Sequence, residues 1–245
     1  MNAKDHYDQH LGNFYSWMLG DFDEKQQEQE NFFWRNGIIP VSRKVAFDLG
    51  AGNGLQAISL AKLGFAVKAI DFNTQLLNEL TSRKRDLNIE IINDDILNYL
   101  QRSRDQAELM TCMGDTITHL ENIDQVVSLV QQMSSHLEPG GKIVLSFRDL
   151  TKELQGDERF IPVKNDDSRI LTCFLEYFPH HVIVHDMLYE KQAGKWIQKV
   201  SSYPKLRLDV ALLTDLLQKN GIQLLKSEII NRMIYLIGKK ASDGL

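Results

Sequence analysis

Three glycines alternate with other residues in the segment Asp48-Leu-Gly50-Ala-Gly52-Asn-Gly54. Glycine lets a backbone turn sharply and lets a ligand lie directly against the main chain. The apolar run before the segment predicts a strand, and residues 55–63 after it predict a helix. Ligands of an open parallel sheet usually bind in the crevice beyond the carboxyl ends of the strands. We therefore interpret the segment as a cofactor-binding loop rather than as a simple turn.

Acidic side chains stand at the ends of three predicted strands, at Asp48, Asp71 and Asp95. Carboxylates accept hydrogen bonds, so this set suits a ligand that presents an ammonium, hydroxyls and an amino group. A dinucleotide is the competing ligand, because Gly52-Asn-Gly54-Leu-Gln-Ala57 also fits the fingerprint G-x-G-x-x-G/A, with Asp71 near the position of its ribose acid. The negative pyrophosphate of a dinucleotide gains nothing from additional acids. The three acids together favour a cationic ligand.

Strand and helix signals alternate over residues 44–148. This alternation predicts a parallel, doubly wound sheet whose right-handed crossovers place helices on both faces. The predicted strands are 45–48, 65–70, 89–92, 107–113 and 142–147, and the predicted helices are 55–63, 74–87, 96–101 and 123–137.

The order of these motifs resembles that of class I S-adenosylmethionine (SAM)-dependent methyltransferases of the small-molecule type. The likeness begins with Asp48 and the three glycines, continues with Asp71 after the second strand, and includes the pair Asp95-Ile96 after the third. The remaining motifs are Met113-Gly114-Asp115 after the fourth strand and Leu137-Glu-Pro139-Gly140-Gly141 before the fifth. An ordered set of this kind over about 105 residues is far more specific than a lone glycine loop.

The resemblance implies a Rossmann-like α/β sheet of seven strands in the order 3-2-1-4-5-7-6, with the last strand antiparallel. Residues 37–148 and 208–245 would form this SAM-binding domain. Residues 1–36, rich in aromatic side chains, predict an N-terminal helical cap of two amphipathic helices. Residues 149–207 predict an antiparallel β lid, because three strand-like runs follow a polar stretch there.

The resemblance also implies the cofactor contacts. In that family an acid at the position of Asp71 binds both ribose hydroxyls, and an acid with the next backbone amide, here Asp95 and Ile96, binds the adenine ring. Phe72 and Ile96 are expected to form the apolar walls of the adenine slot. The expected cofactor-binding residues are Asp48, Gly50, Gly52, Gly54, Asp71, Phe72, Asp95, Ile96, Met113 and Tyr15.

Two residues after the fourth strand are the candidates for catalysis. Methyl transfer is an in-line displacement, so alignment supplies much of the acceleration and a base matters only where the acceptor must lose a proton early. His119 is the candidate base or acceptor-orienting group, and a structural histidine that caps the next helix is the alternative. Asp115 could hold a cationic amine or simply make a turn.

The lid is the expected specificity element. Its strand-like runs carry side chains that could line a substrate pocket or form the surface of a homodimer, and the sequence leaves both readings open. These side chains are Phe174, Tyr177, His185, Tyr189, Trp196 and Tyr203.

The composition indicates which kinds of partner the protein is not expected to bind. The chain has 245 residues, with 28 basic and 33 acidic side chains and a net charge of −5, so binding to nucleic acid is not expected. Two distant cysteines, Cys112 and Cys173, provide neither a disulfide framework nor a zinc site, and we expect no metal. No apolar run approaches the ~20 residues of a membrane span, and the first residues lack the apolar core of a signal peptide, so a cytoplasmic location without membrane contact is expected.

The prediction from sequence is a SAM-dependent methyltransferase that acts on an O or N atom of a small molecule. An NAD(P)-dependent oxidoreductase is the first alternative, although no Tyr-x-x-x-Lys pair supports it. A noncatalytic SAM-binding protein is the second, since it would keep the cofactor loop without turnover.

Overall fold

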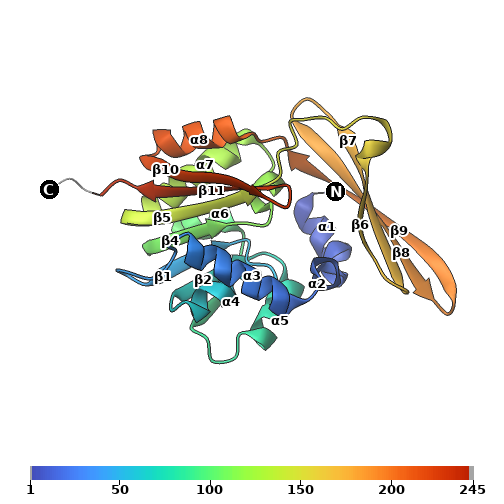
Figure 1. Cartoon of the computed structure of the whole chain (residues 1–245), viewed down its shortest axis with the longest axis horizontal. Helices are drawn as coiled ribbons and strands as arrows, with labels where there is room; N and C mark the ends of the chain where they lie inside the picture. Colours follow the sequence, from blue (N-terminus) through green and yellow to red (C-terminus); the bar gives the residue numbers. More distant parts are fainter. Residues whose placement is uncertain (1, 243–245) are drawn as a thin grey trace.

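The computed structural model describes residues 2–242 and contains two separate sheets (Figure 1). The larger sheet has seven strands in the order β10-β11-β5-β4-β1-β2-β3. Its strands are β1 (Val45–Leu49), β2 (Ala66–Asp71), β3 (Ile89–Asn93), β4 (Ala107–Cys112), β5 (Leu137–Phe147), β10 (Ile222–Ile230) and β11 (Met233–Lys240). The first five strands pair in parallel, whereas β11 pairs antiparallel with both β5 and β10. This is the predicted order 3-2-1-4-5-7-6 when the strands of this sheet are numbered alone, so the prediction is confirmed.

Helices cover both faces of this sheet because successive strand residues point to opposite sides. Phe47 of β1 and Met110 of β4 lie in one hydrophobic core, while their neighbours Ala46 and Leu109 lie in another. The first core contains α6 (Ile96–Arg102), α7 (Ile123–His136) and α8 (Val210–Lys219), and the second contains α3 (Phe22–Arg35), α4 (Leu55–Lys62) and α5 (Thr74–Arg83). The doubly wound arrangement is therefore as predicted.

The smaller sheet is an antiparallel lid with the order β6-β7-β8-β9. Its strands are β6 (Phe160–Asn165), β7 (Arg169–Tyr177), β8 (His181–Gln192) and β9 (Lys195–Leu206). Strand β6 was not predicted, because it lies within the polar stretch that we expected to form a loop. An edge strand exposes one side to solvent and tolerates polar residues and proline, so β6, which contains Pro162 and Lys164, lacks the apolar alternation of a central strand.

The N-terminal region contains three α-helices where the sequence predicted two. Helix α1 (Ala3–Gln9), a 3₁₀ turn (Leu11–Asn13) and α2 (Tyr15–Leu19) replace the first predicted helix. Figure 1 shows α1 and α2 between the large sheet and the lid, whereas α3 lies against the large sheet.

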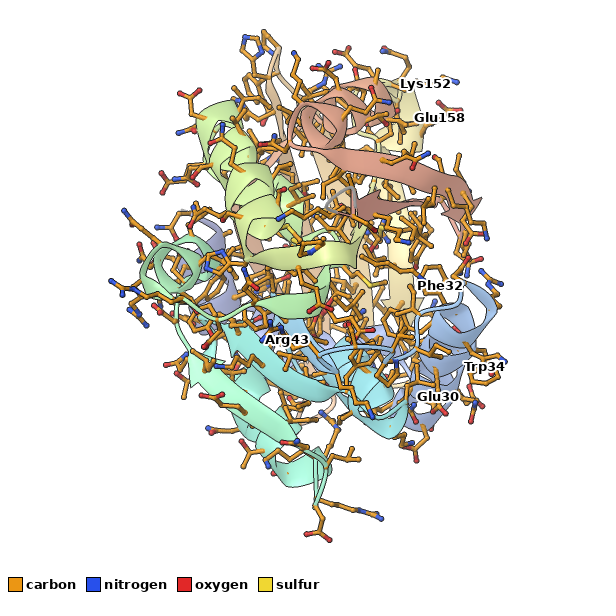
Figure 2. The ribbon with its side chains drawn as sticks, turned by 90° about the vertical axis from the view of Figure 1, so that its left-hand side faces the viewer. Glu30, Phe32, Trp34, Arg43, Lys152 and Glu158 are labelled. Atoms are coloured by element: carbon orange, nitrogen blue, oxygen red, sulfur yellow. The ribbon has the colours of Figure 1, made fainter. Side chains whose placement is uncertain are left out.

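Helix α3 begins at its N-cap Asp21, whose carboxylate accepts a hydrogen bond from the Glu24 amide. Near the other end of the helix, Phe32 and Phe33 are buried, whereas the Trp34 side chain points outward (Figure 2). Within residues 2–242, no helix is both long and apolar enough to cross a membrane.

Candidate active site

A cavity of about 810 Å³ lies beyond the carboxyl ends of β1, β2, β3 and β4. Its walls come from the glycine loop, the loops after those strands, and helices α1 and α2 of the cap. The predicted site residues that line it are Gly50, Gly52, Asp71, Phe72, Asp95, Ile96, Met113, Tyr15 and His119. Three predicted residues, Asp48, Gly54 and Asp115, do not line it.

The glycine loop is held against the end of β2. The amides of Gly50 and Ala51 donate to the carbonyl of Ile70 over 2.8 and 3.0 Å. Gly50 and Gly52 line the cavity, but Gly54 packs against α5 instead, where a Cβ atom would overlap the Leu80 side chain. The third glycine is thus needed for helix packing, and its contact with the cofactor stays a prediction.

Asp71 connects the glycine loop to the cavity wall. Its Oδ2 accepts from the Gly52 amide over 2.8 Å, and its Oδ1 accepts from the Asn73 amide over 2.7 Å. Burial raises the pKa of Asp71, and these two amide donors oppose the rise. A carboxylate has about four acceptor positions, so about two remain for a ligand in the cavity. This arrangement fits the two hydroxyls of a ribose.

Asp95 and Ile96 form the start of α6 at the cavity wall. Asp95 is the N-cap, and its Oδ1 accepts from the amides of Leu97 and Asn98, each over 3.0 Å. No hydrogen bond among the described residues engages its Oδ2. The Ile96 amide lies in the first turn, where helix N–H groups have no partner within the helix. One acceptor and one donor are thus available side by side, which fits the edge of an adenine ring.

Asp48 lies on β1, buried beneath the loop rather than on the cavity wall, and its contact with the cofactor stays a prediction. Its Oδ1 accepts from Thr111 Oγ1 over 2.8 Å, and its Oδ2 is buried with no partner among the described residues. Burial raises the pKa of Asp48 to about 7. An unpartnered buried acceptor near the cavity favours a cationic ligand, because a positive charge nearby would stabilise the ionised carboxylate.

The raised pKa of Asp48 predicts that the free energy of unfolding decreases as the pH rises from about 4 to 7. The folded state binds the Asp48 proton more tightly than the unfolded state, whose carboxyl has the ordinary pKa of 3.8. The stability is therefore fully present below pH 3.8 and is lost as the pH rises towards 7, by at most about 1.4 kcal/mol per pH unit. Asp48→Asn should remove the contribution of Asp48 and so make the slope shallower, which urea unfolding of the ligand-free protein at several pH values will measure.

A matched control is Asp105→Asn. The hydrogen bond from Lys68 lowers the pKa of Asp105, so that carboxyl titrates below this pH window and its loss should not alter the slope. Parallel pH profiles for the wild type and Asp48→Asn would show that the Asp48 environment has been misread.

Asp115 lies on the lid side of the cavity, where two cations engage its carboxylate. Its Oδ2 accepts from Lys205 Nζ over 2.6 Å and from Arg148 Nη1 over 3.2 Å, and its Oδ1 accepts from the Arg148 amide over 2.8 Å. Burial alone would raise the pKa of Asp115, but the charges of Lys205 and then Arg148 hold it well below its usual range. In this structure the Asp115 carboxylate joins the end of β4 to strand β9 of the lid, and the binding of an amine there stays a prediction.

His119 lines the inner end of the cavity, on a 3₁₀ turn that comprises Thr116–His119. Its ring lies 5.6 Å from that of Tyr7, nearly perpendicular to it, and 5.5 Å from that of Tyr203, nearly parallel to it. Its Nδ1 is buried without a partner among the described residues. Burial, followed by the charge of Lys205, lowers the pKa of His119 to about 3, so the imidazole is neutral near pH 7.

Aromatic side chains of the cap and of β2 complete the wall. The Tyr7 ring lies 6.0 Å from that of Tyr15 and 5.9 Å from that of Phe72, and all three side chains line the cavity. Burial raises the pKa of Tyr15 to about 12 and that of Tyr7 well above 10.0, so both phenols stay uncharged.

The lid side chains expected to line a substrate pocket do not line this cavity. Tyr203 is buried behind His119, and Tyr177 packs in a hydrophobic cluster within the lid. Phe174 and His185 lie on the opposite face of the lid from the buried Leu175 and Val184, because side chains alternate along a strand. The reason for the difference is that α1 occupies the inner face of the lid.

Sequence reasoning missed several residues that the cavity brings together. Asn53 lies within the glycine loop, and Thr116 and Glu121 follow β4. The rule that ligands bind at the carboxyl ends of parallel strands would have found all three, since each lies in a loop at that edge. Among residues 2–242, no group of three or more His, Cys, Asp or Glu side chains is arranged to hold a metal ion.

The fold and the site together define a Rossmann-like protein with an acid-lined cofactor cavity above a glycine loop. Residues 46–141 match the model of a family described as a methyltransferase domain. This matched segment resembles the methyltransferase domain of class I SAM-dependent methyltransferases, whose cofactor is SAM.

Two curated relatives are similar over part of the chain. The cypemycin N-terminal methyltransferase of Streptomyces sp is 25% identical over 142 residues, which are 57% of this chain and 57% of that protein. The ubiquinone biosynthesis O-methyltransferase of Cupriavidus pinatubonensis is 27% identical over 115 residues, 46% of this chain and 45% of that protein. The chain thus spans about half the length of the curated relatives it matches.

A solved structure is similar over nearly the whole chain. SAM-bound CalS10, an amino pentose methyltransferase from Micromonospora echinaspora, superposes with a TM-score of 0.73 at 14% identity. The match covers 95% of this chain and 97% of that chain, lid and cap included. At this level of identity the likeness concerns the fold.

Proposed function

We propose that the protein transfers a methyl group from SAM to a nitrogen or oxygen atom of a small molecule. The cavity carries this proposal, because it combines a glycine loop, two acceptor carboxylates and a wall of uncharged aromatic rings. Asp71 would bind the ribose, and Asp95 with the Ile96 amide would bind the adenine. Bound SAM supplies an electrophilic methyl group on a positively charged sulfur.

The aromatic wall suits that positive charge. Tyr7, Tyr15 and Phe72 present rings to the cavity, and an aromatic face attracts a cation through its quadrupole by about 0.5–2 kcal/mol. The neutral phenols add polar atoms without a competing charge. In the reaction, the lone pair of the acceptor forms the new bond to the methyl carbon, the carbon–sulfur bond breaks towards sulfur, and the acceptor loses a proton.

The environment of His119 favours nitrogen over oxygen as the acceptor atom. An imidazole with a pKa near 3 is a weak base and removes a proton early from a hydroxyl only poorly. An uncharged amine needs no early deprotonation, so a neutral imidazole can orient it by a hydrogen bond alone. The similar cypemycin N-terminal methyltransferase and the amino pentose methyltransferase CalS10 support this reading, whereas the ubiquinone biosynthesis relative makes O-methyl transfer the second candidate.

Replacing His119 with alanine should lower kcat by about 10–100-fold, since one orienting hydrogen bond to the acceptor is lost while the cofactor contacts remain. The dissociation constant of SAM should stay within about twofold of the wild-type value. Turnover assays and calorimetry together check both parts. His180→Ala is the matched control, because His180 is exposed on the lid. If the kcat of His119→Ala equals that of His180→Ala, then His119 has only a structural role.

Calorimetric titration with SAM, its demethylated product and NADH tests the proposal as a whole. We expect both sulfur compounds to bind and NADH to give no signal. Tight NADH binding without a response to SAM would favour the oxidoreductase. SAM binding without methyl transfer to any member of a broad acceptor panel would favour the noncatalytic protein.

Two further expectations remain proposals. The outer face of the lid exposes large apolar side chains, including Phe160, Trp196 and Val200, which supports the proposed homodimer through this sheet. Sedimentation of the whole chain will test it. The cytoplasmic location also remains a prediction from sequence.

A further inference from the structure

The cavity ends at an aromatic partition, with polar side chains buried behind it. None of the residues 148–207 lines the cavity, although the lid lies directly beyond it. Tyr7 and His119 form the cavity side of the partition, and Tyr203 of β9 lies behind His119. On the far side, the Tyr203 ring stacks on the His6 ring, with 4.0 Å between centroids.

Behind the partition, four polar side chains meet. His6 Nε2 lies 3.1 Å from Asp186 Oδ2, and His6 Nδ1 lies 2.7 Å from Ser201 Oγ. Cys173 Sγ donates to Asp186 Oδ1 over 2.9 Å. The side chains of His6 and Asp186 are 0% and 3% exposed, so this carboxylate is almost completely shielded from water.

A buried carboxylate in this position is not explained by folding alone. The other inward side chains of the lid are mostly apolar, including Leu171, Val184 and Leu188. Removing a carboxylate from water costs several kcal/mol, and a well-packed apolar group commonly stabilises a core at least as well. A carboxylate kept next to the cofactor cavity is therefore suited to bind a positively charged group.

The helix that now covers Asp186 is short. Helix α1 has only seven residues, so its stability depends on tertiary contacts rather than on its own hydrogen bonds. Its contact with the lid is also incomplete, because His10, 8% exposed, has a buried Nε2 with no partner among the described residues. An unsatisfied buried polar atom weakens the interface that contains it.

We propose that Asp186 is the anchoring group for the methyl acceptor, which binds on the lid face where His6 lies in this structure. This inference rests on the proposed methyltransferase function. The acceptor is a small molecule with a basic nitrogen that stays protonated on Asp186. A second group, an uncharged amine or a hydroxyl, extends past Tyr203 and His119 towards the cofactor. The His6 side chain leaves Asp186 when the acceptor binds and occupies its place in its absence, while Tyr7 of α1 stays at the cavity.

The first test compares short diamines and amino alcohols with the matching diols, in which every amine is replaced by a hydroxyl. The full chain is saturated with the demethylated cofactor product, and binding is measured by calorimetry. The amines should bind the wild type at least about tenfold more tightly than the diols, because the charge-assisted hydrogen bond to Asp186 is lost in the diols. Asp186→Asn should abolish the difference.

Asp215→Asn is the matched control, since it removes a carboxylate from the exposed face of α8. It should bind every compound as the wild type does. His6→Ala removes the side chain that occupies the proposed acceptor site, so it should bind the diamines more tightly than the wild type. This second variant provides a test even if Asp186→Asn folds poorly.

Equal binding of diamines and the matching diols by both the wild type and His6→Ala would overturn the inference. So would an undiminished preference for diamines in Asp186→Asn. Either result leaves the methyltransferase proposal intact as long as SAM binds. Absence of SAM binding to the wild type would instead refute the proposed function, so the two failures are distinguishable.

Discussion

Replacing Asp71 with alanine should lower the affinity for SAM by about 100-fold. The carboxylate has two roles at once, because it accepts the Gly52 and Asn73 amides and presents its remaining acceptor positions to the cavity. Hydrogen bonds to charged groups contribute about 1.5–3 kcal/mol each, and about 2.7 kcal/mol corresponds to 100-fold in affinity. Loss of the ribose contact together with loosening of the glycine loop accounts for that amount.

Calorimetric titration of Asp71→Ala with SAM measures this effect directly. Asp71→Asn keeps the size of the side chain and should lose less affinity than the alanine variant. Asp105→Ala is the control, because it removes an aspartate from the surface pair with Lys68, away from the cavity. An Asp71→Ala protein that binds SAM as tightly as the control would show that the ribose assignment is wrong.

Replacing Gly54 with alanine should destabilise the protein by about 2–5 kcal/mol. Gly54 has a φ of +92°, and a left-handed conformation costs an L-residue about 1–2 kcal/mol. Its added Cβ would also overlap Leu80 Cδ1 and lie 3.1 Å from Leu80 Cγ, and overpacking of a core adds about 1–3 kcal/mol. Leu80 is fully buried on α5, so it has little room to move.

Gly156→Ala separates the two contributions to this effect. Gly156 also has a positive φ, +53°, but nothing lies within 4 Å of the position of its Cβ. It should therefore show only the conformational cost of about 1–2 kcal/mol. Urea unfolding of both variants measures the difference, and an equal loss of stability would contradict the packing role assigned to Gly54.

Residue types and their spacing predicted part of the site but not all of it. Asp71, Asp95 and Ile96 were predicted from their places at strand ends, and all three line the cavity, because the carboxyl ends of parallel strands meet at one edge of the sheet. Asp48 shares the same pattern yet lies beneath the loop. The alternation of side chains on β1 and the path of the loop decide which carboxylate reaches the cavity, and neither is visible in spacing.

The lid contains two features that the sequence did not predict. Its strands were predicted from alternation, but the polar edge strand β6 was not, since an edge strand needs no apolar pattern. The pairing of His6 with Asp186 joins residues 180 positions apart, and no local signal indicates such a contact.

The sequence by itself determined the kind of fold and favoured the kind of cofactor. Local patterns predict strands and helices, the resemblance of the ordered motifs to class I SAM-dependent methyltransferases implied the order of the sheet, and the glycine loop with its acids favours a cationic cofactor. Only the tertiary structure decided which predicted residues face the cavity, that Asp115 binds Lys205 and Arg148, and that α1 covers the lid. The physical reason is that these outcomes depend on packing between distant segments, where burial and charge are set by neighbours that the chain brings together only when it folds.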